Sequence, residues 1–178
     1  MSPFRTLSRG LIAAALFLSL GAPAAFALST GTQVTNPELR DGNDKPATIP
    51  DFGKKVLAIF YTDPDVSDQN DPFADKLKAA DLDKNVYRGV GVANMKDTWL
   101  PDSVIRSIVR KKIEKYDATI LTDPGHLLRT AWDLGDCNEK AIVIVLDKSG
   151  TVRYVKKGAM SQAEIESTYN LVLELMKQ

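Results

Sequence analysis

The most informative stretch of the sequence is Ala141-Ile-Val-Ile-Val-Leu146, which is followed by Asp147-Lys-Ser-Gly150 and then by Thr151-Val-Arg-Tyr-Val155. A continuous apolar run of this length is typical of a strand that is covered on both faces. The polar segment after it predicts a tight turn in which Gly150 adopts a positive φ angle. The stretch therefore predicts a deeply buried strand that continues into a β-hairpin.

Strands and helices alternate on the N-terminal side of this hairpin. Further apolar runs predict strands over Val56–Tyr61, Val86–Val92 and Thr119–Leu121. Proline and capping residues predict that helices begin at Asp71-Pro72, Pro101-Asp102-Ser103 and Asp123-Pro124. A last amphipathic helix follows Ser161, which forms a capping box with Glu164. This order predicts an α/β fold with three layers, α/β/α, in which helices cover both faces of a mixed central sheet.

Residues 1–27 have the pattern of a secretory signal peptide. Arg5 and Arg9 precede the apolar run Leu11–Leu20, and Ala25-Phe26-Ala27 supplies the small residues of a cleavage site. Cleavage after Ala27 is the expectation and an uncleaved anchor is the alternative, although the run is short for a membrane-spanning helix. Residues 28–178 are then expected to form one domain in the periplasm that is not embedded in the membrane, with residues 28–55 as a loop-rich lead-in.

Composition excludes several classes of function. The chain of 178 residues has 23 basic and 23 acidic residues, so no global charge favours nucleic acid as a partner. It contains one cysteine and one histidine. These counts exclude an intramolecular disulfide, a Cys/His zinc cage and a Cys-X-X-Cys redox centre. No cofactor is expected.

The order of the predicted elements resembles the thioredoxin fold, and the lead-in with the inserted strand and helix resembles the redoxin group. That group includes peroxiredoxins and periplasmic thiol-disulfide proteins. The segments Leu127-Leu-Arg-Thr-Ala-Trp-Asp-Leu134 and Val145-Leu-Asp-Lys-Ser-Gly-Thr-Val-Arg-Tyr-Val155 are similar to the YtfJ family of exported bacterial proteins, which has no settled biochemical role. The resemblance covers roughly residues 30–178 and implies a thioredoxin-like fold with a periplasmic location.

The resemblance also locates the position of the redox site. In active members, the loop after the first core strand carries Cys-X-X-Cys at a helix N-terminus, where the helix dipole stabilises a thiolate. Here those positions fall at or next to Asp65 and Asp68, in a loop that begins at Asp63. The family's cis-proline position falls near Ala141. The loop therefore has aspartates where active members have cysteines, and Ala141 stands where they have proline. Both replacements argue against ordinary thiol-disulfide oxidoreductase or peroxidase activity, and an enzymatic role is not favoured.

The loop in place of the redox site is acidic, with carboxylates at Asp63, Asp65, Asp68 and Asp71. One hypothesis is a Ca²⁺ site, because calcium takes six to eight oxygen ligands. The favoured interpretation is structural: Asp71 caps the following helix, and the other aspartates interact with the helix dipole or stabilise the turn.

The single thiol, Cys137, lies in the turn that leads into the buried strand. It is interpreted as a small buried hydrophobe, and Asp136 and Glu139 beside it would raise its pKa. The alternative is a thiol that forms mixed disulfides, or a dimer, through Cys137. His126 is interpreted as structural, and Trp99 and Trp132 as packing residues. The basic residues from Arg106 to Lys115 are interpreted as a solvated helix face.

Two functional hypotheses remain. The favoured one is a non-catalytic thioredoxin-fold module that binds a protein or a small ligand in the periplasm. The alternative is a thiol-dependent redox protein that uses Cys137 with an external partner.

Overall fold

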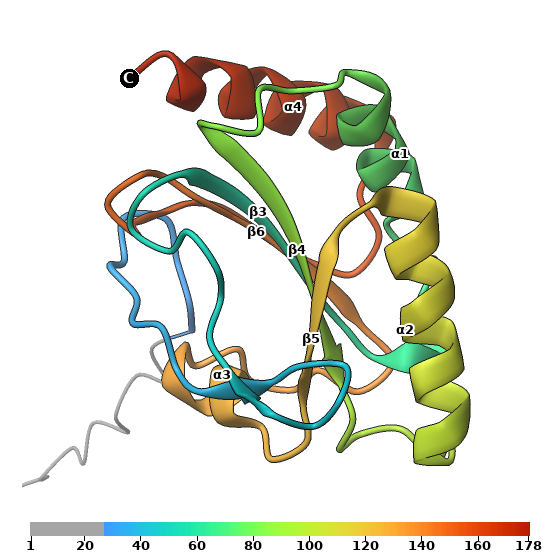
Figure 1. Ribbon diagram of the computed structural model, residues 1–178. Coiled ribbons are helices and arrows are strands. Elements are labelled where there is room, and N and C mark those ends of the chain that lie inside the picture. Colours follow the sequence, from blue (N-terminus) through green and yellow to red (C-terminus); the bar gives the residue numbers. More distant parts are fainter. Residues whose placement is uncertain (1–26) are drawn as a thin grey trace, which may run out of the picture.

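The computed structural model describes residues 27–178, so the predicted signal peptide lies outside the described residues except for Ala27. The centre of the structure is a seven-stranded sheet with the order β2-β1-β5-β4-β3-β6-β7 (Figure 1). Among the described residues, no helix is long and apolar enough to cross a membrane.

Five strands build the main part of the sheet. The central strand β3 (Val56–Thr62) pairs in parallel with β4 (Tyr87–Asn94), which pairs in parallel with β5 (Thr119–Asp123). On its other side, β3 pairs antiparallel with β6 (Ala141–Leu146), which pairs antiparallel with β7 (Val152–Lys157). All six residues of β6 are buried, and Gly150 has a φ of 81°. The predicted mixed sheet and hairpin are therefore confirmed.

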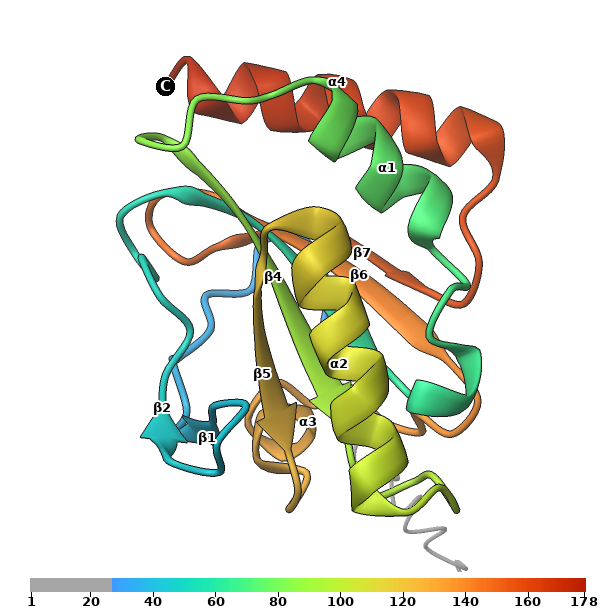
Figure 2. The same cartoon turned by 45° about the vertical axis from the view of Figure 1, so that its right-hand side comes forward.

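Helices cover both faces of this sheet. The helices α1 (Asp71–Ala79), α2 (Asp102–Tyr116) and α4 (Gln162–Met176) lie on one face (Figure 2). The short helix α3 (Leu127–Ala131) and the lead-in pack on the opposite face, where Leu128 and Trp132 join the largest apolar cluster. This arrangement is the expected α/β/α order of layers.

The loop-rich lead-in contains two short strands. β1 (Leu39–Arg40) and β2 (Pro46–Ala47) form an antiparallel hairpin, and Arg40 pairs with Thr122 of β5. Leu39 and Ile49 are fully buried against the sheet. The lead-in thus extends the sheet beyond β5 and adds apolar side chains to the core.

Two helix starts differ from the sequence-based prediction, whereas a third agrees with it. The N-cap of α1 is Asn70 and not Asp71, which is the first helical residue. The helix α3 begins at Leu127, later than the predicted start at Asp123. At α4, both hydrogen bonds of the capping box between Ser161 and Glu164 are present. Asp71 differs because its carboxylate contacts α2, and the start of α3 differs because Asp123 is still the last residue of β5.

The hairpin turn between β6 and β7 depends on the carboxylate of Asp147. One of its oxygens accepts hydrogen bonds from the backbone N–H of Ser149 at 2.8 Å and of Thr151 at 3.0 Å, and Arg153 Nε donates to the other at 2.7 Å. Burial by itself would raise the pKa of Asp147, but the hydrogen bonds outweigh it and lower the pKa to about 2.

The substitution Asp147→Asn is expected to lower the free energy of unfolding by about 2 kcal/mol at neutral pH, because hydrogen bonds to a charged acceptor are lost. The folded-state pKa lies below the ordinary value of 3.8, so this stabilisation is complete above that pH and is lost as the pH falls through about 2. Urea unfolding of both proteins along a pH series checks this. A difference between the two proteins that stays constant down to the lowest pH would contradict it.

Candidate functional site

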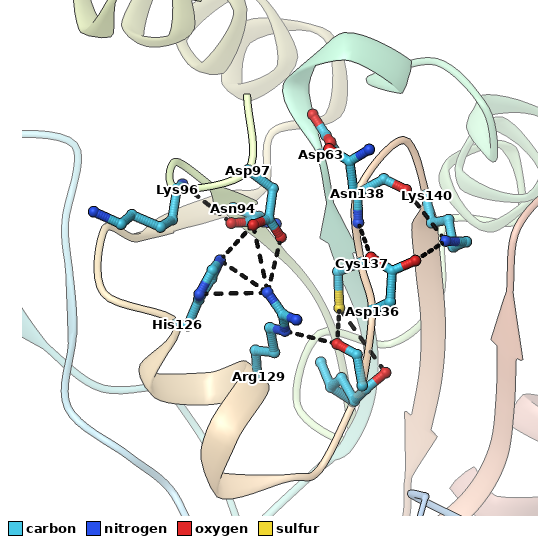
Figure 3. A network of polar contacts seen from close by, with 12 residues as sticks. Asp63, Asn94, Lys96, Asp97, His126, Arg129, Asp136, Cys137, Asn138 and Lys140 are labelled. Carbon is cyan, nitrogen blue, oxygen red and sulfur yellow. Dashed lines mark hydrogen bonds and ion pairs between the residues drawn. The ribbon is translucent and has the colours of Figure 1, made fainter. Parts of the chain in front are cut away.

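Buried polar side chains gather where the three parallel strands end. Asp63 directly follows β3, and Asn94 and Asp123 are the last residues of β4 and β5; all three are fully buried. In open α/β sheets, ligands bind at the carboxyl ends of the strands. We refer to this region, with the loops 63–70, 95–101, 124–126 and 133–140, as the carboxyl edge (Figure 3).

Asp63 ties two loops of the carboxyl edge together. Its carboxylate accepts hydrogen bonds from the backbone N–H of Asp65 at 3.0 Å and of Glu139 at 2.8 Å. Gln69 makes a similar bridge, because its side-chain oxygen accepts the backbone N–H of Ala141 at 2.9 Å. The acidic loop therefore holds the chain that leads into β6.

The other aspartates of this loop point to different partners. Asp65 is exposed and accepts a hydrogen bond from the Thr98 hydroxyl at 3.0 Å, and Asp68 is exposed. Asp71 forms ion pairs with Lys112 and Lys115 of α2. Burial by itself would raise the pKa of Asp71, but these two lysines outweigh it and lower the pKa.

These positions do not support the calcium hypothesis. Within residues 27–178, no group of three or more acidic, histidine or cysteine side chains is arranged to hold a metal ion. The prediction that Asp71 caps the following helix is wrong, because its carboxylate binds Lys112 and Lys115 of α2. Asn70 occupies the cap position and uses its side chain to bind Gly158 and Met160.

A polar network joins the loop after β4 to α3 (Figure 3). Asp97 lies at its centre: its carboxylate is 2.9 Å from His126 Nε2 and 3.1 Å from the Arg129 guanidinium, and it accepts a hydrogen bond from Asn94 Nδ2 at 2.8 Å. Arg129 Nε also donates to the carbonyl of Gly135 at 2.6 Å. His126 therefore lies in a network that positions loops, in accord with its structural interpretation.

Asp123 is the second centre of the carboxyl edge. Its carboxylate accepts hydrogen bonds from the Tyr61 hydroxyl at 3.2 Å and from the backbone N–H groups of Leu127 at 2.6 Å and Leu128 at 3.0 Å. Burial, followed by the negative charge of Asp123, raises the pKa of Tyr61. Asp123 thus caps α3 as predicted, but it does so from the end of a strand across the turn at Pro124-Gly125.

The thiol of Cys137 is inside the protein. The residue is fully buried, and its Sγ donates a hydrogen bond to the Gly135 carbonyl at 3.4 Å. Burial raises the pKa of Cys137, and Lys157 and Arg129 offset this only in part. The predicted direction is correct, but burial and not the neighbouring carboxylates is the main cause. A protonated, buried thiol is a poor nucleophile, and its position disfavours a disulfide-linked dimer.

Apolar side chains are exposed in the loop after β4 and at the start of α3. Trp99 has 83% of its surface exposed, and Leu127 has 46%. The prediction that Trp99 packs in the core or at its rim is therefore wrong, whereas Trp132 is buried and donates to the Thr35 carbonyl at 2.8 Å. Trp99 follows Asp97 by two residues and Leu127 follows His126 directly, so the Asp97–His126 contact positions both exposed side chains.

Nothing in the sequence indicated that Asp97 and Arg129 are partners, because Asp97 lies in a loop between two predicted elements and Arg129 lies in the following helix. The only available signal was that Asp97 and His126 each closely follow a predicted parallel strand, and the ends of such strands meet at one edge. The resulting arrangement is rich in satisfied hydrogen bonds and has an exposed tryptophan. The buried networks hold the loops in place, while the Trp99 side chain remains exposed at their surface.

Comparison with known sequences gives a family match over most of the chain. Residues 54–176 match a family described as "Bacterial protein of unknown function (YtfJ_HI0045)". The "Uncharacterized protein YtfJ" of Escherichia coli K12 is 27% identical over 126 residues, which cover 69% of this chain and 67% of that protein. An uncharacterized protein of Haemophilus influenzae is 27% identical over 110 residues, which cover 61% of this chain and 59% of that protein.

Comparison with solved structures supports the same fold. A thiol-disulfide isomerase from Corynebacterium glutamicum has a TM-score of 0.59 and 14% identity, with coverage of 83% of this chain and 97% of that chain. A peroxiredoxin-like protein from Aquifex aeolicus has a TM-score of 0.58 and 14% identity, with coverage of 84% and 88%. At such identities the likeness shows the fold alone, and it confirms the thioredoxin-like architecture.

Proposed function

The chain belongs to the YtfJ_HI0045 family of bacterial proteins of unknown function, and we propose that it is an exported, non-catalytic thioredoxin-fold module that binds a partner in the periplasm. The main support for a non-catalytic role is that the single thiol is buried and has a raised pKa. Cys137 is fully buried with a raised pKa, and Asp65 and Asp68 occupy the loop in which active relatives of this fold carry cysteines.

Export is supported by the signal-peptide pattern in residues 1–27. A positively charged start, an apolar run and small residues before Leu28 are the features that a secretion machinery reads. After cleavage behind Ala27, the described part of the chain would be the mature protein.

Binding at the carboxyl edge is supported by the exposed side chain of Trp99. Tryptophan is enriched among the residues that dominate binding energy at protein interfaces. The networks around Asp97 and Asp63 restrain the surrounding loops, and a restrained surface loses less entropy on binding than a mobile one. A protein, or a small ligand with an apolar group, is therefore the expected partner.

Capture from periplasmic extract tests the proposal. The mature protein on a resin is compared with Trp99→Ala and Cys137→Ser variants, each with and without reductant. Loss of the tryptophan is expected to weaken retention of the captured partner by about tenfold or more, because hot-spot residues contribute about 2 kcal/mol or more and about 1.4 kcal/mol corresponds to tenfold. The Cys137→Ser variant is expected to retain it as the wild type does.

A matched control is Ile113→Ala, which removes an apolar side chain that is 37% exposed on α2, away from the carboxyl edge. If Trp99→Ala and Ile113→Ala reduced the retention of the partner equally, this result would contradict binding at the carboxyl edge. Capture that requires Cys137 and disappears with reductant would instead support the thiol-dependent alternative.

A further inference from the structure

The structure contains a cavity of about 600 Å³ between α1 and α2, above β4. In Figure 2, these two helices lie on the same face of the sheet with β4 and β5 behind them. Small-molecule sites in proteins commonly have volumes of about 300–1,000 Å³. The size of this cavity therefore matches that of a ligand site.

Glycines of β4 leave the floor of the cavity open. Tyr87, Gly89, Gly91 and Ala93 alternate along the strand and so face the same side of the sheet. A Cβ atom at Gly91 would lie 3.0 Å from Cγ1 of Ile120, which is too close without a shift of that side chain. Ile120 of β5 therefore packs directly against Gly91, and neither glycine adds a side chain to the floor of the cavity.

The walls of the cavity are mainly apolar. On one side α1 supplies Ala74 and Leu77, and on the other α2 supplies Ile105, Ile108 and Val109. The polar contacts between α1 and α2 lie among lysines and aspartates: Lys112 pairs with Asp71, and Lys115 is 3.2 Å from Asp71 and 3.3 Å from Asp75.

One end of the cavity is polar and carries charges of both signs, because Lys78, Lys84 and Lys112 line it together with Asp71, Asp81 and Asp117. Three ammonium groups surround the Tyr116 ring, with distances to its centroid of 5.9 Å for Lys78, 5.6 Å for Lys112 and 4.7 Å for Lys115. These groups lie over the ring, and the buried Tyr116 hydroxyl has no hydrogen-bond partner among residues 27–178. Lys78 donates to the backbone carbonyl of Lys115 and, in the described part of the chain, pairs with no carboxylate.

We propose that this cavity binds one long-chain fatty acid. The alkyl chain lies over Gly89 and Gly91 between the apolar walls, and the carboxylate accepts hydrogen bonds from the Lys78 ammonium and the Tyr116 hydroxyl. A mainly apolar cavity that offers one ammonium group without a carboxylate partner among the described residues, that of Lys78, and one buried hydroxyl, that of Tyr116, matches an alkyl chain with one anionic group. Pro64, Ser67 and Asn70 of the carboxyl edge also line this cavity, whereas Trp99 does not, so the site differs from the partner-binding surface proposed around Trp99.

Fluorescence of cis-parinaric acid, which rises when the fatty acid enters an apolar site, tests the proposal on the mature protein. Saturable binding with displacement by palmitate is expected. The Ala74→Phe variant fills the cavity and is expected to lower the affinity by more than about tenfold. Lys78→Ala is expected to lower it about fivefold, the size of a partly exposed ion pair, and Lys177→Ala, at the exposed C-terminal end of α4, is the matched control.

Circular dichroism and thermal melting establish that each variant is folded, and Ala74→Leu replaces Ala74→Phe if the larger side chain prevents folding. Two results would overturn the proposal. One is the absence of saturable binding by the wild-type protein. The other is binding by a folded cavity-filling variant with the affinity of the wild type, which would place the fatty acid elsewhere.

Discussion

Replacing Asp123 with alanine is expected to lower the free energy of unfolding by about 3 kcal/mol. The carboxylate is fully buried and accepts hydrogen bonds from the Tyr61 hydroxyl and from the backbone N–H groups of Leu127 and Leu128. Alanine would leave these donors without an acceptor in the interior. The effect is measured by chemical denaturation of the mature protein at neutral pH.

A double-mutant cycle with Tyr61→Phe separates the phenol from the helix cap. Tyr61→Phe alone is expected to cost about 1 kcal/mol, and the double variant is expected to cost less than the sum of the two single variants. Asp68→Ala is the matched control, because Asp68 is exposed in the loop after β3, and it is expected to change stability by less than about 0.5 kcal/mol. If Asp123→Ala lowered the free energy of unfolding as little as Asp68→Ala does, this result would contradict the central role of the Asp123 carboxylate.

The thiol of Cys137 is expected to react with a maleimide at least about a hundredfold more slowly in the native protein than in denaturant. The residue is fully buried and burial raises its pKa, so both the accessibility and the thiolate fraction are low. The rate is followed by mass spectrometry at neutral pH. In an insulin-reduction assay with dithiothreitol, the protein is expected to give no rate above the background.

A thiol moved to the exposed loop is the control for this measurement. The variant that combines Asp65→Cys with Cys137→Ser has its only thiol at an exposed position after β3, and it is expected to react in the native state nearly as fast as in denaturant. Fast native modification of the wild type, together with insulin reduction, would favour the thiol-dependent alternative.

Much of the fold could be predicted because its signals are local. The run Ala141–Leu146 coincides with β6, and the Asp147–Gly150 turn and the Ser161–Glu164 capping box are both present. Each feature depends on residues a few positions apart. The strand depends on a run of apolar residues, the turn on a positive φ at Gly150, and the helix start on hydrogen bonds between Ser161 and Glu164. Such interactions are largely independent of the rest of the molecule.

The partners of the polar side chains were harder to predict. Asp71 was predicted to cap a helix, but α2 brings two lysines to it across the face of the sheet. Trp99 was predicted to pack inside and is exposed, because its loop extends beyond the end of β4. In both cases, chain segments far apart in the sequence decide the environment of the side chain.

The sequence by itself determined the order of elements, the hairpin and the absence of paired thiols in the loop after β3. Only the tertiary structure decided that Cys137 is buried, that Asp97 joins His126 to Arg129, and that the glycines of β4 lie under a cavity between α1 and α2. The physical reason is that the spacing of apolar residues and the residues of a turn determine structure over only a few positions of the chain. Burial, ion pairing and cavity volume depend on which distant segments the sheet brings together.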